Sequence, residues 1–110
     1  MEDRFWKTKS FLFRIREQKR LVELLRRRIS LYDTDELQEK LAKAEQDLRC
    51  VTIEAMERIG KLPDINQQMV MTKRYVDMLT WEEIADNMNM SVRAVQKLHG
   101  RALPEMEKEM

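Results

Sequence analysis

The sequence predicts an all-α protein, and three observations support this fold class. Gly and Pro number only two each in 110 residues, which is too few for the turns of a β-sandwich or barrel. Apolar residues recur at separations of three and four along most of the chain. Residues that cap helix starts precede several of these stretches. At this length we expect one small domain or a module with an extension, which excludes a multi-domain enzyme.

The first two helical stretches are predicted to pair as an antiparallel hairpin over residues 1–62. The first runs from about Asp3 to Ile29, and its apolar positions are Phe11, Ile15, Val22, Leu25 and Ile29, with Gln18 in the one polar gap. The second has apolar positions at Leu37, Leu41, Ala44, Leu48, Val51 and Ala55. Asp33 and Glu36 predict a capping box between them. Basic residues flank the first stripe and acidic residues the second, which favours pairing of the two helices.

The hairpin alone does not bury all of its large apolar residues. Each arm is about 40 Å long at roughly 1.5 Å per residue, longer than a module of some fifty residues covers. The residues left over are Phe5, Trp6, Phe11, Phe13, Leu21 and Leu24. We therefore expect a homodimer. The alternative is that these side chains pack on the second half of the same chain.

A domain boundary is expected between the hairpin and residues 63–110. Gly60 is predicted to end the second helix as a left-handed stop, and Asp64 to cap the next helix. Three further helical stretches are expected, at residues 65–77, 81–88 and 92–103. Pro104 removes a helix hydrogen bond, so the last six residues are expected to bend away.

The last two stretches predict a helix-turn-helix. Thr80 with Glu83 forms a capping box, and Ser91 caps the final stretch. Counting from Trp81, the motif needs apolar residues at positions four, eight, ten, fifteen and eighteen, which are Ile84, Met88, Met90, Val95 and Leu98. The small Ala85 stands where the helices cross, and Asn89 in the turn tolerates a positive φ.

The outer face of the final stretch predicts contact with double-stranded DNA. It carries Val92, Arg93, Gln96, Lys97 and Arg101, and no acidic residue. In a major groove Arg or Lys matches guanine and Gln matches adenine. The groups expected to contact phosphates are Lys73, Arg74, Thr80, Ser91, His99 and Arg101.

The stretch RYVDMLTWEEIADNMNMSVRAVQKLHGRAL resembles region four of bacterial sigma factors, whose helix-turn-helix reads a promoter element. It also resembles small phage and prophage regulators of the ArpU and RinA type, which share the RY, WEEIA and LHGRAL landmarks. The resemblance covers residues 62–103 and implies a transcription regulator that acts through host RNA polymerase. It places the base-reading positions at Val92, Arg93, Gln96 and Lys97, where Val92 departs from the polar residue that is common there.

Charge distribution and composition exclude several classes of protein. Residues 1–28 hold ten Lys or Arg against four Asp or Glu, whereas residues 64–110 hold six against eight. No apolar run exceeds three residues, so neither a membrane span nor a secretory signal is expected. The lone Cys50 is expected to be an inert packed thiol in a reducing cytoplasm. With one His and one Cys, no metal site, cofactor site or catalytic triad is expected, and the chain is predicted not to be an enzyme.

Two alternative functions stay open at this point. Small subunits of DNA-packaging terminases also join a helix-turn-helix to oligomerising helices, but their rings are larger than a dimer. A second alternative is a protein-interaction module whose helix-turn-helix no longer binds DNA. The nine methionines are expected to fill cores, with Met56, Met69, Met88 and Met106 at apolar helix positions.

Overall fold

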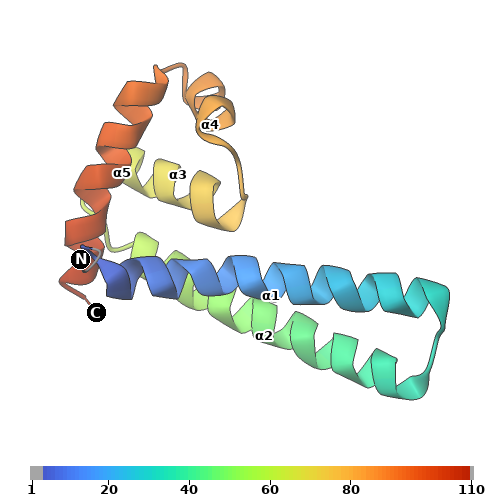
Figure 1. Cartoon of the computed structure of the whole chain (residues 1–110). Coiled ribbons are helices and arrows are strands. Elements are labelled where there is room, and N and C mark those ends of the chain that lie inside the picture. Colours follow the sequence, from blue (N-terminus) through green and yellow to red (C-terminus); the bar gives the residue numbers. More distant parts are fainter. Residues whose placement is uncertain (1–3, 110) are drawn as a thin grey trace.

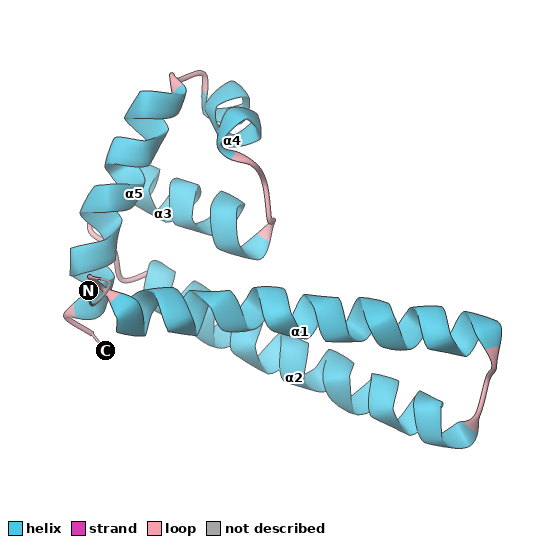
Figure 2. Ribbon diagram, in the orientation of Figure 1, coloured by secondary structure: helices cyan, strands magenta, loops and turns pink. Residues whose placement is uncertain are grey.

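The computed structural model describes residues 4–109, and all of its regular structure is helical (Figures 1 and 2). The elements are α1 Trp6–Leu31, α2 Asp35–Ile59, α3 Ile65–Met71, the π-helical turn η1 Thr72–Val76, α4 Trp81–Met88 and α5 Val92–Glu107. The long helices α1 and α2 form an antiparallel hairpin, and α3, α4 and α5 stand to one side near the start of α1 (Figure 1). The all-α class, with a helical hairpin and a helix-turn-helix module, is thus confirmed.

The far half of the hairpin has a narrow core of its own. Val22 and Leu25 of α1 pack with Ala44 of α2 there. The predicted capping box at Asp33 is wrong, because Thr34 caps α2 by accepting the Leu37 backbone N–H at 3.2 Å. Asp33 instead accepts a hydrogen bond from the Gln38 side chain. Helix α1 begins at Trp6, and the predicted start at Asp3 lies outside the described residues.

Helices α3, α4 and α5 with the turn η1 form what we call the module. The half of the hairpin next to the module shares a core with it. This junction core contains Phe11, Leu12 and Ile15 of α1, Val51, Ala55 and Ile59 of α2, Leu62, Met71 of α3, and Ala102, Leu103 and Met106 of α5. The predicted bend at Pro104 is wrong, and α5 continues to Glu107. Burial explains this, because Leu103 and Met106 on either side of the proline are 5% and 2% exposed. Packing on both sides offsets the missing hydrogen bond.

The end of α5 also caps the start of α1. Phe5, the residue before α1, supplies no side-chain cap, and its φ of 60° is in the left-handed region. The carboxylate of Glu107 accepts the Thr8 backbone N–H at 3.0 Å and the Thr8 hydroxyl. An acidic group at a helix start is favourable, since it binds N–H groups that have no partner within the helix. Residues 99 apart in sequence thereby fasten the module to the hairpin.

Several local expectations differ from the structure. Gly60 is not left-handed, because its φ of −62° and ψ of −16° continue the helical turn of α2. Cys50 is exposed rather than packed. Met56 and Met69 are also exposed, so they do not fill a core, whereas Met106 is buried.

The six apolar residues left over by the hairpin divide into two groups. Phe11 is buried and Phe5 is half-buried, and both pack in the junction core of their own chain. The exposed group is Trp6, Phe13, Leu21 and Leu24. Packing on the same chain therefore accounts for only part of the set. No helix among residues 4–109 is both long and apolar enough to cross a membrane.

Candidate nucleic-acid interface

The module is held together by a small apolar core under the helix-turn-helix. Its buried members are Val70 of α3, Ile84 and Ala85 of α4, and Val95 of α5. Met88, Met90 and Leu98 pack against them, as the spacing from Trp81 predicts. A larger side chain at residue 85 would separate α4 from α5, because this position is 5% exposed at the contact between them. The core thus fixes the angle at which α5 is presented.

The turn between α4 and α5 has the predicted geometry. Asn89 has φ 55° and ψ 48°, a left-handed conformation that Asn adopts more readily than most residues. The Met90 backbone N–H closes the turn on the Ala85 carbonyl at 2.9 Å. Ser91 then caps α5 by accepting the Ala94 N–H at 3.1 Å. Helix α5 therefore starts at a defined point, with its first residues exposed or half-buried.

The start of α4 is fixed by a complete capping box. The Thr80 hydroxyl accepts the Glu83 N–H at 3.2 Å, and the Glu83 carboxylate accepts the Thr80 N–H at 3.0 Å. The hydrogen bond from the Thr80 backbone, with a smaller contribution from its side chain, lowers the pKa of Glu83. Glu83 and its neighbour Glu82 lie in the first turn of α4, where negative charge is favourable.

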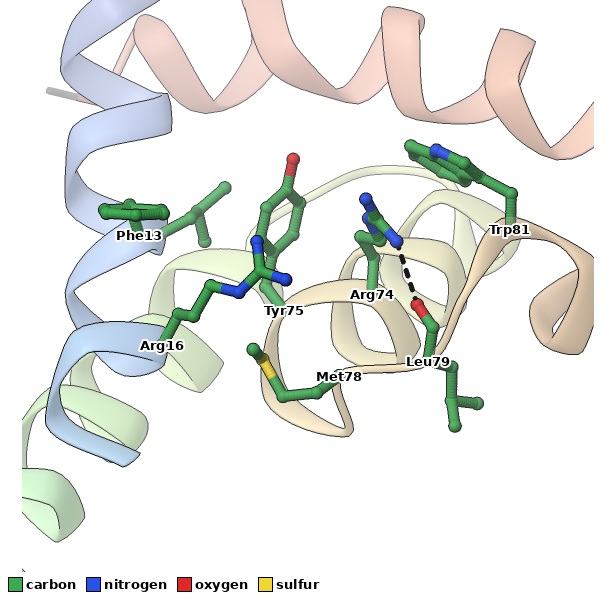
Figure 3. Close-up of a pocket in the computed structure, with 8 residues that line it drawn as sticks. Phe13, Arg16, Arg74, Tyr75, Met78, Leu79 and Trp81 are labelled. Atoms are coloured by element: carbon green, nitrogen blue, oxygen red, sulfur yellow. Dashed lines mark hydrogen bonds between the residues drawn. The ribbon is translucent and has the colours of Figure 1, made fainter. Parts of the chain in front are cut away.

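A cluster of aromatic and basic side chains lies between η1, α4 and α5. The Tyr75 hydroxyl and His99 Nε2 are 2.6 Å apart, and Trp81 meets the His99 ring edge-on with centroids 5.0 Å apart. The Arg74 guanidinium lies over the Trp81 ring, 4.3 Å from its centroid. Arg74 also donates a hydrogen bond to the Leu79 carbonyl at 3.1 Å, drawn as the dashed line in Figure 3. Arg74 and His99 are therefore half-buried and engaged by other groups of the module.

Burial and nearby positive charge keep His99 neutral. Desolvation is the larger effect, and the charges of Arg74 and Lys9 add to it, so the pKa of His99 falls to about 4. Burial also raises the pKa of Tyr75. A neutral imidazole has no positive charge to attract phosphate, and the Nε2 of His99 is already engaged by Tyr75. The position of His99 thus indicates a structural role in the module.

The cleft beside this cluster is too small for an ordinary substrate. It is lined by Leu12, Phe13, Arg16, Arg74, Tyr75, Met78, Leu79 and Trp81, and its volume is about 110 Å³ (Figure 3). Small-molecule sites usually exceed roughly 300 Å³. Among the described residues, no three His, Cys, Asp or Glu side chains converge as metal ligands. This cleft is therefore a poor candidate for a small-molecule site.

The outer face of α5 presents donors without acids. Arg93, Gln96, Lys97 and Arg101 are all exposed, and together they form what we call the α5 outer face. Val92 differs, because it is half-buried and packs on the core under the helix-turn-helix. Of the four predicted base-reading residues, the structure brings three together on an open surface. Their contact with bases stays a prediction.

The predicted phosphate contacts are dispersed over the module. Thr80 and Ser91 are exposed at the starts of α4 and α5, and their oxygens already accept the capping N–H groups. Lys73 lies in a shallow groove with Ile65, Met69 and Asp77, which includes no α5 residue. Only Arg101 shares the α5 outer face.

One residue of this surface escaped the sequence reasoning. Gly100 is exposed on α5, and a Cβ built there meets no atom within 4 Å. It stands three residues after Lys97 and four after Gln96, so it shares their face. The helical spacing was the available signal, because residues 96, 97 and 100 fall on one side of a helix.

Comparison with known families agrees with this geometry. Residues 53–106 match the family described as Sigma-70, region 4. The match extends from the last turns of α2 almost to the end of α5, so it includes the whole helix-turn-helix. The chain thus carries a sigma-70 region 4-like helix-turn-helix of the DNA-binding type. Searches of curated proteins and of solved structures gave no significant match.

Proposed function

We propose that this chain is a phage-type transcription regulator that binds double-stranded DNA through the α5 outer face. The observation that carries the proposal is the exposure of Arg93, Gln96 and Lys97 on one side of a helix whose position is fixed by a helix-turn-helix core. A helix fits the major groove, and these side chains match the hydrogen-bonding edges of guanine and adenine. The match to Sigma-70, region 4 supports the same class of ligand.

The proposal divides the residues into two roles. Arg93, Gln96 and Lys97 read bases, while Arg101, Ser91 and Thr80 position the helix on the phosphates. The hydroxyls of Ser91 and Thr80 keep a hydrogen to donate, because the capping bonds use only their oxygens as acceptors. Arg74, His99 and Val92 act inside the module, and Lys73 adds a more distant positive charge.

Positive charge outside the module strengthens the proposed complex. Residues 64–110 have eight acids against six bases, and non-specific affinity depends mainly on phosphate neutralisation. The ten Lys or Arg of residues 1–28 are on the segment that includes most of α1. Since α1 packs beside the module in the junction core, its charge adds to the potential around α5.

The proposal includes the setting in which the regulator works. It acts as a homodimer in the cytoplasm of a bacterial host, without catalysis of its own, and it contacts host RNA polymerase. The resemblance to sigma region four and to phage regulators motivates the polymerase contact. The exposed apolar side chains of α1 motivate the homodimer.

The decisive experiment is selection of bound duplexes from a random pool at a fixed salt concentration. Recovery of a shared motif supports sequence-specific reading. Arg93→Ala should then lower the preference for that motif over random DNA by roughly 5- to 150-fold, the equivalent of about 1–3 kcal/mol per bidentate contact. Arg49→Ala, an exposed arginine on α2, is the matched control and should leave the preference unchanged.

Other outcomes point to the alternative functions. Equal binding of all sequences, unaltered by Arg93→Ala, would contradict base reading. An assembly of eight to ten chains would instead favour a terminase small subunit, and absence of salt-dependent duplex binding would favour a protein-interaction module.

A further inference from the structure

Helix α1 has two apolar faces, and only one of them is covered. Phe11, Ile15 and Val22 are buried on the face toward α2 and the module. The other face carries large apolar side chains that are 56%, 44%, 44% and 78% exposed, namely Trp6, Phe13, Leu24 and Leu31. Since each residue rotates the helix by about 100°, these four point roughly opposite to the buried ones. A helix that is apolar on both sides needs a second packing partner.

The uncovered face has the spacing of a coiled coil. Its positions alternate steps of four and three along all of α1, and we call them the outer seam: Trp6, Ser10, Phe13, Glu17, Arg20, Leu24, Arg27 and Leu31. Ser10, Glu17, Arg20 and Arg27 are exposed like their apolar neighbours. The seam thus has apolar positions toward both ends and a charged centre.

The outer seam is complementary to itself when reversed. If a second copy of α1 lies antiparallel about a two-fold axis between residues 18 and 19, Trp6 faces Leu31 and Phe13 faces Leu24 of the other copy. A two-fold interface requires this self-matching, because each patch must serve as both halves of the contact. Every large apolar residue of the seam then meets another one.

Charge selects the antiparallel arrangement over the parallel one. In the antiparallel register Glu17 faces Arg20 of the other copy, and beside the seam Arg16 lies diagonally across from Glu23, offset by two residues from the facing position. Each of these pairs occurs twice because of the two-fold axis. A parallel register would place Glu17 against Glu17 and Arg20 against Arg20, which repel. A polar layer at the centre of a seam is also a known device for fixing register.

We propose that the outer seam is the homodimer interface, with the α1 helices of two copies paired antiparallel about this axis. The module packs on the first half of α1, so the axis places the two modules toward opposite ends of the paired helices, related by two-fold symmetry. That symmetry suits a palindromic DNA site. The inference rests on the proposed homodimer but not on DNA binding, and it is tested without DNA.

The first test is molar mass by light scattering across a concentration series. The wild-type chain should have twice the monomer mass, and Leu24→Glu should raise the dissociation constant at least tenfold. Met56→Glu places the same charge on the exposed face of α2 and should stay dimeric. Circular dichroism checks that both variants keep their helices. A monomeric wild type would overturn both the dimer and the interface. A Leu24→Glu dimer as tight as the wild type would overturn the interface alone.

A charge exchange tests the central layer. Glu17→Arg and Arg20→Glu should each weaken the dimer, because each creates two like-charge pairs across the axis. The double variant restores opposite charges in reversed order and should recover most of the wild-type affinity. If the double variant is as weak as the two single variants, Glu17 does not face Arg20 and the register is wrong.

Cross-linking distinguishes the two orientations. In a Cys50→Ser background, Phe13→Cys with Leu24→Cys should give a covalent dimer on mild oxidation. Phe13→Cys alone should not, because an antiparallel pair separates the two residues 13 by about 16 Å along the axis, beyond disulfide reach. Removal of Cys50 is needed because its thiol is exposed. Efficient cross-linking by Phe13→Cys alone would show a parallel pair and overturn the proposal.

Discussion

Helices α1 and α5 meet in one core, where Phe11 and Leu12 pack with Leu103, yet their outer faces carry different chemistry. The outer seam of α1 alternates large apolar groups with charges of both signs. The α5 outer face has three cations and an amide, with no large apolar side chain among them. Both outer faces carry arginine, so the presence of positive charge alone does not separate them.

The difference indicates which partner each face suits. Helix α5 supplies hydrogen-bond donors on a rigid backbone, and such donors match base edges and phosphates. Helix α1 supplies an exposed apolar row with heptad spacing, and such a row is matched by another helix. The junction core connects the two faces, so the orientation of α5 relative to a dimer axis on α1 is set by packing rather than by a linker.

The largest expected effect on stability comes from a substitution in the junction core, which α1 and α5 share. Leu12 is 1% exposed in the junction core, so Leu12→Ala should lower the free energy of unfolding by about 3 kcal/mol. Met56→Ala is the control, because Met56 is 51% exposed and should change stability by less than about 0.5 kcal/mol. Urea unfolding followed by circular dichroism measures both. Equal losses would contradict the placement of the core.

A smaller expected effect is the pH dependence of stability, which tests whether His99 lies on the inner face of α5. His99 has a pKa lowered from 6.5 to about 4, so the folded state binds its proton less readily than the unfolded state. The resulting stability is present above pH 6.5 and is lost as the pH falls toward 4. With allowance for solvent screening of this partly exposed ring, we expect a loss on the order of 1–2 kcal/mol over that interval.

The control for this titration is His99→Phe, which keeps an aromatic ring but cannot bind a proton. Urea unfolding at a series of pH values should show a shallower decline between pH 6.5 and 4 in this variant than in the wild type. Identical slopes would show that other groups cause the acid sensitivity. They would also mean that His99 is open to solvent and available to phosphate after all.

The sequence predicted what depends on local spacing. The hairpin follows from steps of three and four residues, and the helix-turn-helix core follows from the positions of Ile84, Ala85 and Val95 relative to Trp81. Asn89 is left-handed because the turn needs a residue that tolerates positive φ. The cationic positions of α5 were found by the same periodicity, since the core residues of a helix determine which side chains point outward.

What the sequence did not predict depends on contacts between distant segments. Leu12 and Thr8 lie off the main apolar stripe of α1, and the approach of η1 and α5 buries them. The continuation of α5 past Pro104 and the cap from Glu107 come from the same packing of the module on α1. Arg74 appeared available for phosphate because no local pattern shows that Trp81 folds beneath it.

The smallest effect concerns the backbone of the α5 outer face itself. Gly100 is within α5, and a Cβ there meets no atom, so Gly100→Ala should raise the free energy of unfolding by about 0.5–1 kcal/mol. Gly60→Ala is the matched comparison. Its Cβ would lie 3.2 Å from the Met56 carbonyl oxygen, which must shift to admit it, and we expect a smaller gain. Thermal and urea unfolding of both variants show which substitution raises the free energy of unfolding more. A loss of stability in Gly100→Ala would show that another part of the molecule packs on this face, which would withdraw it from the proposed DNA contact.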